Sequence, residues 1–96
     1  MHMSSDQLND LRRSIDNIDA ALLRLMAERF KTTEKIGNLK KKEQRAIADP
    51  DREQEQIERY KRIAFEAGLD ESLALRLHAF LVEEAKKGQH SIMTSS

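Results

Sequence analysis

The sequence predicts an all-α protein built from three helices, the first of them very long. Its 96 residues include one Pro and three Gly, only 4% are aromatic, and 35% are charged. This composition is typical of long amphipathic helices and does not suit a sheet. Apolar residues recur at steps of three and four, the spacing of one helix face. A chain of this length forms one domain, which we expect over residues 5–90, with disordered termini at 1–4 and 91–96.

The first helix is predicted from about Asp6 to about Lys42, with no interior Pro. At 1.5 Å per residue it is about 50 Å long, so it needs packing partners along its whole length. A row of apolar residues follows one face, and the next step of four along that row reaches Arg29. The row, which we call the seam, consists of Leu8, Leu11, Ile15, Ile18, Leu22 and Leu25; beyond Arg29 it resumes with Thr32, Ile36 and Leu39.

The second helix is predicted from Pro50 to about Ala67, because Asp49-Pro50 combines an N-cap with Pro at the first helical position. Gly68 is placed to end this helix, and Asp70 is placed to cap the third. The inner faces are expected to contain Ile57, Tyr60, Ala64 and Ala67 in the second helix, and Leu73, Leu77, Phe80, Leu81, Ala85 and finally Gln89 in the third.

The two shorter helices together match the length of the first but leave one of its flanks uncovered. A second copy of the long helix is the natural cover for that flank. We therefore expect a homodimer whose long helices lie antiparallel or cross about a two-fold axis.

Several kinds of chemistry are disfavoured by the composition. The chain has no Cys, which excludes disulfides. It also has no apolar run long enough for a membrane span or a signal peptide, so we expect a cytoplasmic location. A formal net charge of zero argues against a general nucleic-acid binder. We expect no metal and no cofactor, since His2, His78 and His90 lack ligand spacing and no Gly-rich phosphate loop is present. His78 is expected to be a partly buried helix residue.

Polar residues on or beside the apolar faces form a cation-rich set. Arg29 is the clearest, because a guanidinium stays protonated and its burial is costly without an anion. The other members are Arg12, Lys40, Arg52, Glu53 and Gln89. Such a set suits an anionic ligand, and the fork of an Arg suits a carboxylate.

Arg12 and Arg29 are 17 residues apart, about 25 Å along one helix, so only a dimer could bring them to one small molecule. Simpler interpretations stay open for each residue. Arg29 could set helix register, extend its head to solvent or pair with Glu53. Asp49 is explained as a cap, and Arg12 and Arg52 as surface residues.

The pattern of these residues resembles the all-helical chorismate mutases over roughly residues 8–90. It comprises Leu11-Arg12-x-x-Ile15-Asp16-x-Ile18-Asp19-x-x-Leu22-Leu23-x-Leu25-Met26-x-x-Arg29, then Ile36-Gly37-x-x-Lys40, then Asp49-x-x-Arg52-Glu53. The resemblance implies an intertwined homodimer in which each long helix spans both active sites. It also implies the rearrangement of chorismate to prephenate, toward phenylalanine and tyrosine, without a cofactor.

The resemblance also implies a role for each residue of the set. Arg29, and Arg12 from the other subunit, would hold the substrate carboxylates, and Arg52 would add positive charge there. Lys40 would bridge a carboxylate and the ether oxygen, and Gln89 would donate to that oxygen from the opposite side. Glu53 would accept the ring hydroxyl, helped by the backbone N–H of Asp49. Ala85 stands where the family often has Ser, so one hydrogen bond is missing or is replaced by water.

Two other functions fit parts of the pattern. An isochorismate-pyruvate lyase shares the fold and would use a similar cationic site, although the full residue set favours the mutase. A non-catalytic helical dimerisation or regulatory module would use Arg29 only as a register device, and it predicts that Arg29→Leu stabilises the fold.

Overall fold

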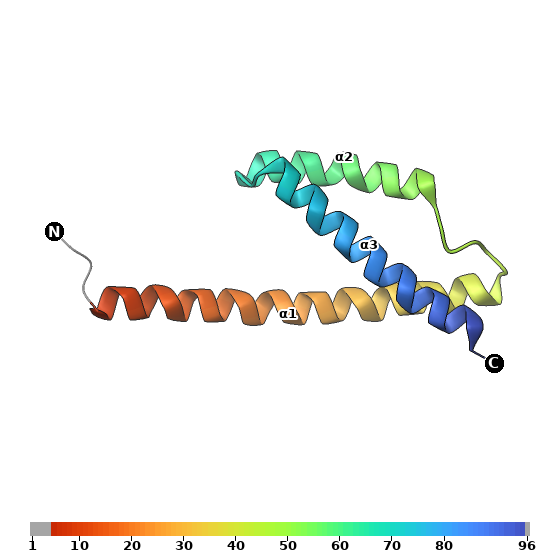
Figure 1. The fold of residues 1–96 in the computed structure, drawn as a ribbon, viewed down its shortest axis with the longest axis horizontal. Coiled ribbons are helices and arrows are strands. Elements are labelled where there is room, and N and C mark those ends of the chain that lie inside the picture. The colour runs from red at the N-terminus through yellow and green to blue at the C-terminus, as the bar shows by residue number, and fades with distance from the viewer. Residues whose placement is uncertain (1–4, 96) are drawn as a thin grey trace. The chain divides into compact units, whose positions relative to one another are not determined.

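The computed structural model describes residues 5–95 and consists of three helices (Figure 1). They are α1 (Ser5–Lys42), α2 (Pro50–Ala67) and α3 (Glu71–Thr94), and no strand occurs within the described residues. The all-α class and the long first helix are therefore confirmed. Residues 1–4 and 96, which were expected to be disordered, lie outside the described part of the chain. No helix in that part is both long and apolar enough to cross a membrane.

The described chain divides into two units, residues 5–32 and residues 33–95, with the boundary inside α1. The first unit is helix alone, and its polar face carries local pairs such as Arg13 with Asp10 and Lys31 with Glu28. All six seam residues are exposed, from 40% at Leu8 to 66% at Leu25. The seam thus forms an apolar row that this unit does not cover by itself.

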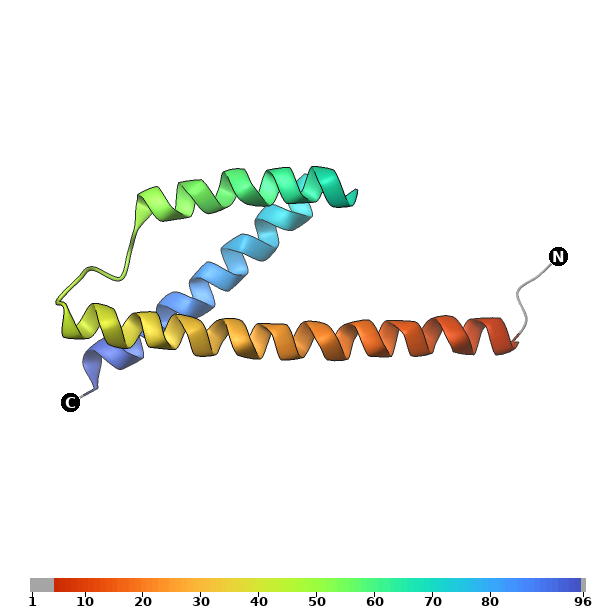
Figure 2. The same cartoon turned by 180° about the vertical axis from the view of Figure 1, so that it is seen from behind.

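The second unit contains the end of α1 together with α2 and α3, and the last two helices lie side by side (Figures 1 and 2). Small residues allow their close approach, with Ala64 of α2 and Ala74 and Leu81 of α3 buried. His78 is also buried, its Nε2 lies 3.1 Å from Gln56 Oε1, and its ring meets the Tyr60 ring edge-on at 4.8 Å. The buried His is therefore part of the packing between α2 and α3.

The buried face of α3 differs from the expected one. Leu81 and Ala85 are covered as predicted, but Leu73, Leu77 and Phe80 are 45%, 43% and 51% exposed. Two rows on this helix satisfy a spacing of three and four, and the row beginning at Ala74 faces α2. A small side chain at that position lets the helix backbones approach closely, which periodicity alone does not reveal.

The predicted caps are confirmed. Asp49 Oδ1 accepts from the Arg52 N–H at 3.1 Å, and Asp70 Oδ2 accepts from the Leu73 N–H at 3.0 Å. Gly68 ends α2 with a φ of 69°, in the left-handed region that favours Gly. Local chemistry at these positions therefore sets where the two shorter helices begin and where α2 ends.

The C-terminal end of α3 is longer than expected, because residues 91–94 are helical where we predicted disorder. Lys41 explains part of this extension. Its Nζ donates to the carbonyl oxygens of Ile92 and Ser95 at the C-terminal end of α3, where carbonyl groups lack the acceptor pattern of the helix interior. The last turn of α3 is thus held against the end of α1.

Candidate active site

Gln89 occupies a buried position where α3 passes the end of α1. The residue is 6% exposed, and its Nε2 donates to the carbonyl oxygen of Thr33 at 3.0 Å. Gly37 makes this position possible, because a Cβ there would lie 2.9 Å from Gln89 Cγ and 3.1 Å from Ile92 Cδ1. The absence of a side chain at Gly37 therefore lets α3 come close enough to seat Gln89.

Lys40 lies one turn after Gly37 on the same helix, so it shares that face of α1. Its half-buried side chain donates from Nζ to the carbonyl oxygen of Ile47 at 2.7 Å. Ile47 belongs to the connection that leads to Asp49 and α2. Lys40 therefore links the end of α1 to the segment that begins α2.

Glu53 lies in the first turn of α2, where its backbone N–H donates to the Asp49 carbonyl at 3.0 Å. Its carboxylate Oε1 lies 2.8 Å from the Nζ of Lys86 on α3. The backbone N–H of Asp49 makes no hydrogen bond with the described residues. A carboxylate and a free donor therefore stand together at the start of α2.

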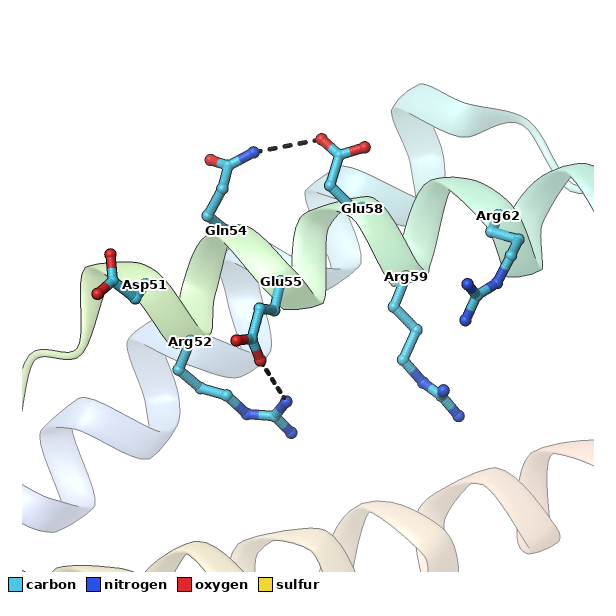
Figure 3. A pocket seen from close by; sticks show the side chains of 7 residues that line it. All are labelled: Asp51, Arg52, Gln54, Glu55, Glu58, Arg59 and Arg62. Atoms are coloured by element: carbon cyan, nitrogen blue, oxygen red, sulfur yellow. Dashed lines mark hydrogen bonds and ion pairs between the residues drawn. The ribbon is translucent and has the colours of Figure 1, made fainter.

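Arg52 is an exposed member of the predicted site residues in the second unit. Its side chain is 60% exposed and its Nη1 lies 3.5 Å from Glu55 Oε2. Figure 3 shows Arg52, Arg59 and Arg62 pointing to the same side of α2. A hollow of about 570 Å³ lies there, lined by Asp51, Arg52, Gln54, Glu55, Glu58, Arg59 and Arg62. Because every lining residue comes from one helix, this hollow is an open surface beside the Arg52 head.

The two remaining arginines belong to the first unit. Arg12 is exposed, whereas Arg29 is half-buried and its Nη1 is fully buried without any hydrogen-bond partner among the described residues. A buried guanidinium nitrogen without an acceptor is costly, so an anion beside Arg29 would stabilise it.

The second unit contains Lys40, Asp49, Glu53 and Gln89 of the predicted set. Gln89 packs against Gly37, which lies three residues before Lys40, and Gln89 itself lies three residues after Lys86, which pairs with Glu53. Sequence reasoning missed Lys86. The available signal was its spacing of three from Gln89, which places both residues on one face of α3. The half-buried Ala85 offers no hydroxyl, as expected.

Comparison of the sequence with known proteins identifies its family. The family model for chorismate mutase type II matches residues 11–90. The chain is 30% identical to the chorismate mutase of Methanocaldococcus jannaschii over 81 residues, which cover 84% of this chain and 82% of that protein. It is 41% identical over 58 residues to a bifunctional chorismate mutase/prephenate dehydratase of Aquifex aeolicus, covering 60% of this chain and 16% of that protein. The chain belongs to the chorismate mutase type II family, a family of isomerases.

Proposed function

We propose that two copies of this chain bind chorismate at two shared sites and rearrange it to prephenate. Chorismate mutase activity follows from membership of the family, so the proposal concerns the assembly and the residues that perform the reaction. The rearrangement is unimolecular and needs no nucleophile. The protein must hold a flexible dianion in its compact conformer and stabilise the negative charge that develops on the ether oxygen as the C–O bond breaks.

The observation that carries the proposal is the buried, unpartnered Nη1 of Arg29. A guanidinium stays charged at any pH a protein tolerates, so burial without an acceptor is stable only if another molecule supplies the acceptor. A substrate carboxylate is a suitable partner, because two parallel N–H groups match its two oxygens. Arg29 is accordingly a primary binding residue for the substrate.

Lys40 and Gln89 are proposed to act on the ether oxygen from opposite sides. Lys40 has three N–H donors and uses one on the Ile47 carbonyl, while Gln89 uses one of its two N–H donors on the Thr33 carbonyl. Each side chain therefore keeps a donor for the substrate. Since both are held by protein contacts beforehand, little reorganisation is needed as charge develops on the oxygen.

Glu53, Asp49 and Arg52 are proposed to contact the rest of the substrate. Glu53 accepts the ring hydroxyl, and the free N–H of Asp49 donates to the same hydroxyl oxygen. Arg52 is exposed and weakly paired, so its guanidinium can turn toward a carboxylate when substrate binds.

The site also requires a second chain. The exposed seam of α1 is an apolar surface suited to a second copy, and a two-fold arrangement would bring Arg12 of one chain toward Arg29 of the other. The dimer thereby supplies both the missing apolar cover and the second arginine. A cytoplasmic location remains a prediction from the sequence.

Mixing two inactive variants tests this proposal. Arg12→Ala and Arg29→Ala should each lose nearly all activity while remaining dimeric by size-exclusion chromatography. If subunits exchange, each mixed dimer has one site lacking both arginines and one intact site. An equimolar mixture should then recover up to about a quarter of wild-type activity, since random exchange makes half of all dimers mixed.

The product and the exchange itself provide the controls. Chorismate should yield prephenate, whereas release of pyruvate from isochorismate would identify the lyase instead. Exchange is followed independently with a tagged chain. No recovery despite complete exchange would refute the shared site, and retained activity in Arg29→Ala would refute the role of that residue.

A further inference from the structure

We propose that Lys86 is a positioning residue of this active site, which orients the Glu53 carboxylate and offsets its charge. The inference rests on the proposed function, because it concerns the residue that would accept the ring hydroxyl of the substrate. Lys86 was not among the residues expected from the sequence, and its contact with Glu53 is what assigns it to the site.

The ion pair between Lys86 and Glu53 differs from the other described ion pairs. All six of the other described pairs join residues within three positions of each other along the chain and are local surface pairs. Lys86 and Glu53 instead join α3 to α2 at 2.8 Å, with side chains only 33% and 32% exposed. A partly shielded pair between two helices fixes both side chains more firmly than an exposed pair within one helix.

The next residue along α3 shows that this pairing is specific to position 86. Lys87 has the same side chain, but it is 65% exposed and pairs with Glu84 of its own helix at 3.3 Å. Lys86 instead lies on the face of α3 that carries Gln89 three residues later. One lysine is therefore directed toward the site and its neighbour toward solvent.

The contact suits the task proposed for Glu53. Lys86 contacts Oε1, and Oε2 makes no hydrogen bond or ion pair with the described residues, so it is available to the substrate hydroxyl. A carboxylate close to a dianionic substrate would repel it, and the ammonium of Lys86 compensates that charge. Lys86 thus offsets the negative charge of Glu53, so that the site can still attract a dianionic substrate.

The effect of removing Lys86 follows from this role. The ring hydroxyl does not react, so its contact with Glu53 is similar in the bound substrate and in the transition state, and its loss raises KM more than it lowers kcat. We expect Lys86→Met to raise KM about tenfold, as for the loss of one charge-assisted hydrogen bond, and to change kcat less than about twofold. Lys86→Arg should restore most of the affinity.

The experiment measures steady-state kinetics with chorismate for the assembled protein, with Lys87→Met as the matched control. The control should have the KM of the wild type. Thermal unfolding is recorded for every variant, because a purely structural lysine would lower Tm without changing KM. An unchanged KM in Lys86→Met, or an equal rise in Lys87→Met, would overturn the inference.

A double variant separates this inference from the proposed function. If Lys86 acts through Glu53, Lys86→Met should add less than about twofold to the KM of Glu53→Gln, because coupled residues are not additive. Fully additive effects would overturn the inference while leaving the proposed function intact. If Glu53→Gln itself has the KM of the wild type, the proposed role of Glu53 fails and the inference fails with it.

Discussion

The two units of this chain differ in how far their own residues bury apolar side chains and provide hydrogen-bond partners for buried polar groups. Residues 33–95 bury Ala64, Ala74 and Leu81, and they provide a partner for the buried amide of Gln89. Residues 5–32 leave the whole seam exposed and leave Arg29 Nη1 buried without a partner. Residues 33–95 therefore pack partly on themselves, although Leu73, Leu77 and Phe80 stay about half exposed, whereas residues 5–32 include no buried residue.

The exposed seam and the buried Arg29 nitrogen of residues 5–32 would be stabilised by different partners. An exposed row of Leu and Ile is stabilised by another apolar surface, and full burial of each such side chain contributes about 1.5–3 kcal/mol. A buried guanidinium is stabilised by an anion. In the proposed function, a second chain would supply the apolar surface and a dianionic substrate the anion, so assembly and catalysis would both depend on residues 5–32.

The largest expected effect comes from breaking the seam. Ile18 lies in the middle of the seam and is 61% exposed in the single chain. In a dimer, Ile18→Glu would bury an unpaired carboxylate in each chain, which costs about 3–5 kcal/mol at each site. We expect a monomer without detectable mutase activity, measured by light scattering coupled to size exclusion and by chorismate consumption.

Asn17→Glu is the matched control for this seam variant, because it places the same carboxylate on the neighbouring, exposed position outside the seam. It should remain a fully active dimer. A dimeric, active Ile18→Glu protein would show that the seam is not the dimer interface, and the contrast between the two units would then need another explanation.

A smaller effect is expected from Gly37, which lies in residues 33–95. In Gly37→Ala the new Cβ would lie 2.9 Å from Gln89 Cγ, so the amide must shift although Ala favours the helix. We expect activity to fall about tenfold to a hundredfold, the range for a displaced hydrogen-bond donor, with a stability change within about 2 kcal/mol. Chorismate kinetics and urea unfolding measure the two quantities.

Gly88→Ala separates the helix effect from the packing effect. No atom lies within 4 Å of a Cβ built at Gly88, which is one position before Gln89 in the same helix. This variant should be more stable by about 0.5–1 kcal/mol and retain wild-type activity. Equal activity in Gly37→Ala and Gly88→Ala would argue against a role for the close approach at Gly37.

Local chemistry explains why much of the fold could be predicted from the sequence. Asp49, Gly68 and Asp70 act within a few residues of themselves, so the beginning and end of α2 and the start of α3 are readable without tertiary structure. The face of α3 that packs on α2 was predicted only in part, because Ala74 competes with Leu73 and Leu77 for the inner side. That choice depends on how closely two backbones approach.

The candidate site shows the same limit. Its residue types follow from the seam and from the resemblance to a known family, but the partners of those residues join distant parts of the chain. The pair of Lys86 with Glu53 is set by the packing of α3 on α2, and the contact of Lys40 with the Ile47 carbonyl by the path of the connection after α1; spacing can place a residue on a helix face but does not reveal its partner. The helical end of α3 was missed for a related reason, since Lys41 holds it from α1.

The smallest expected effect is a pH dependence at Asp70, which lies in residues 33–95. The Ser72 hydroxyl donates to Asp70 Oδ2 at 2.9 Å and the Leu73 N–H donates at 3.0 Å, and these bonds, with a smaller contribution from the charge of Arg76, hold the pKa of Asp70 below its ordinary value of 3.8. A lowered pKa in the folded state means that ionised Asp70 stabilises α3 at neutral pH. This contribution is lost as the pH falls from the unfolded pKa through the folded one.

Asp70→Asn isolates this contribution, because Asn keeps a capping oxygen and removes the titration. The wild type should be slightly more stable than the variant, by the same margin from neutral pH down to about pH 5, and the margin should narrow below about pH 4. Thermal unfolding of both proteins across this range provides the measurement. If residues 33–95 are as self-contained as their packing indicates, the narrowing should also occur in the Ile18→Glu monomer. A margin that changes only in the dimer would mean that the cap at Asp70 depends on the second chain.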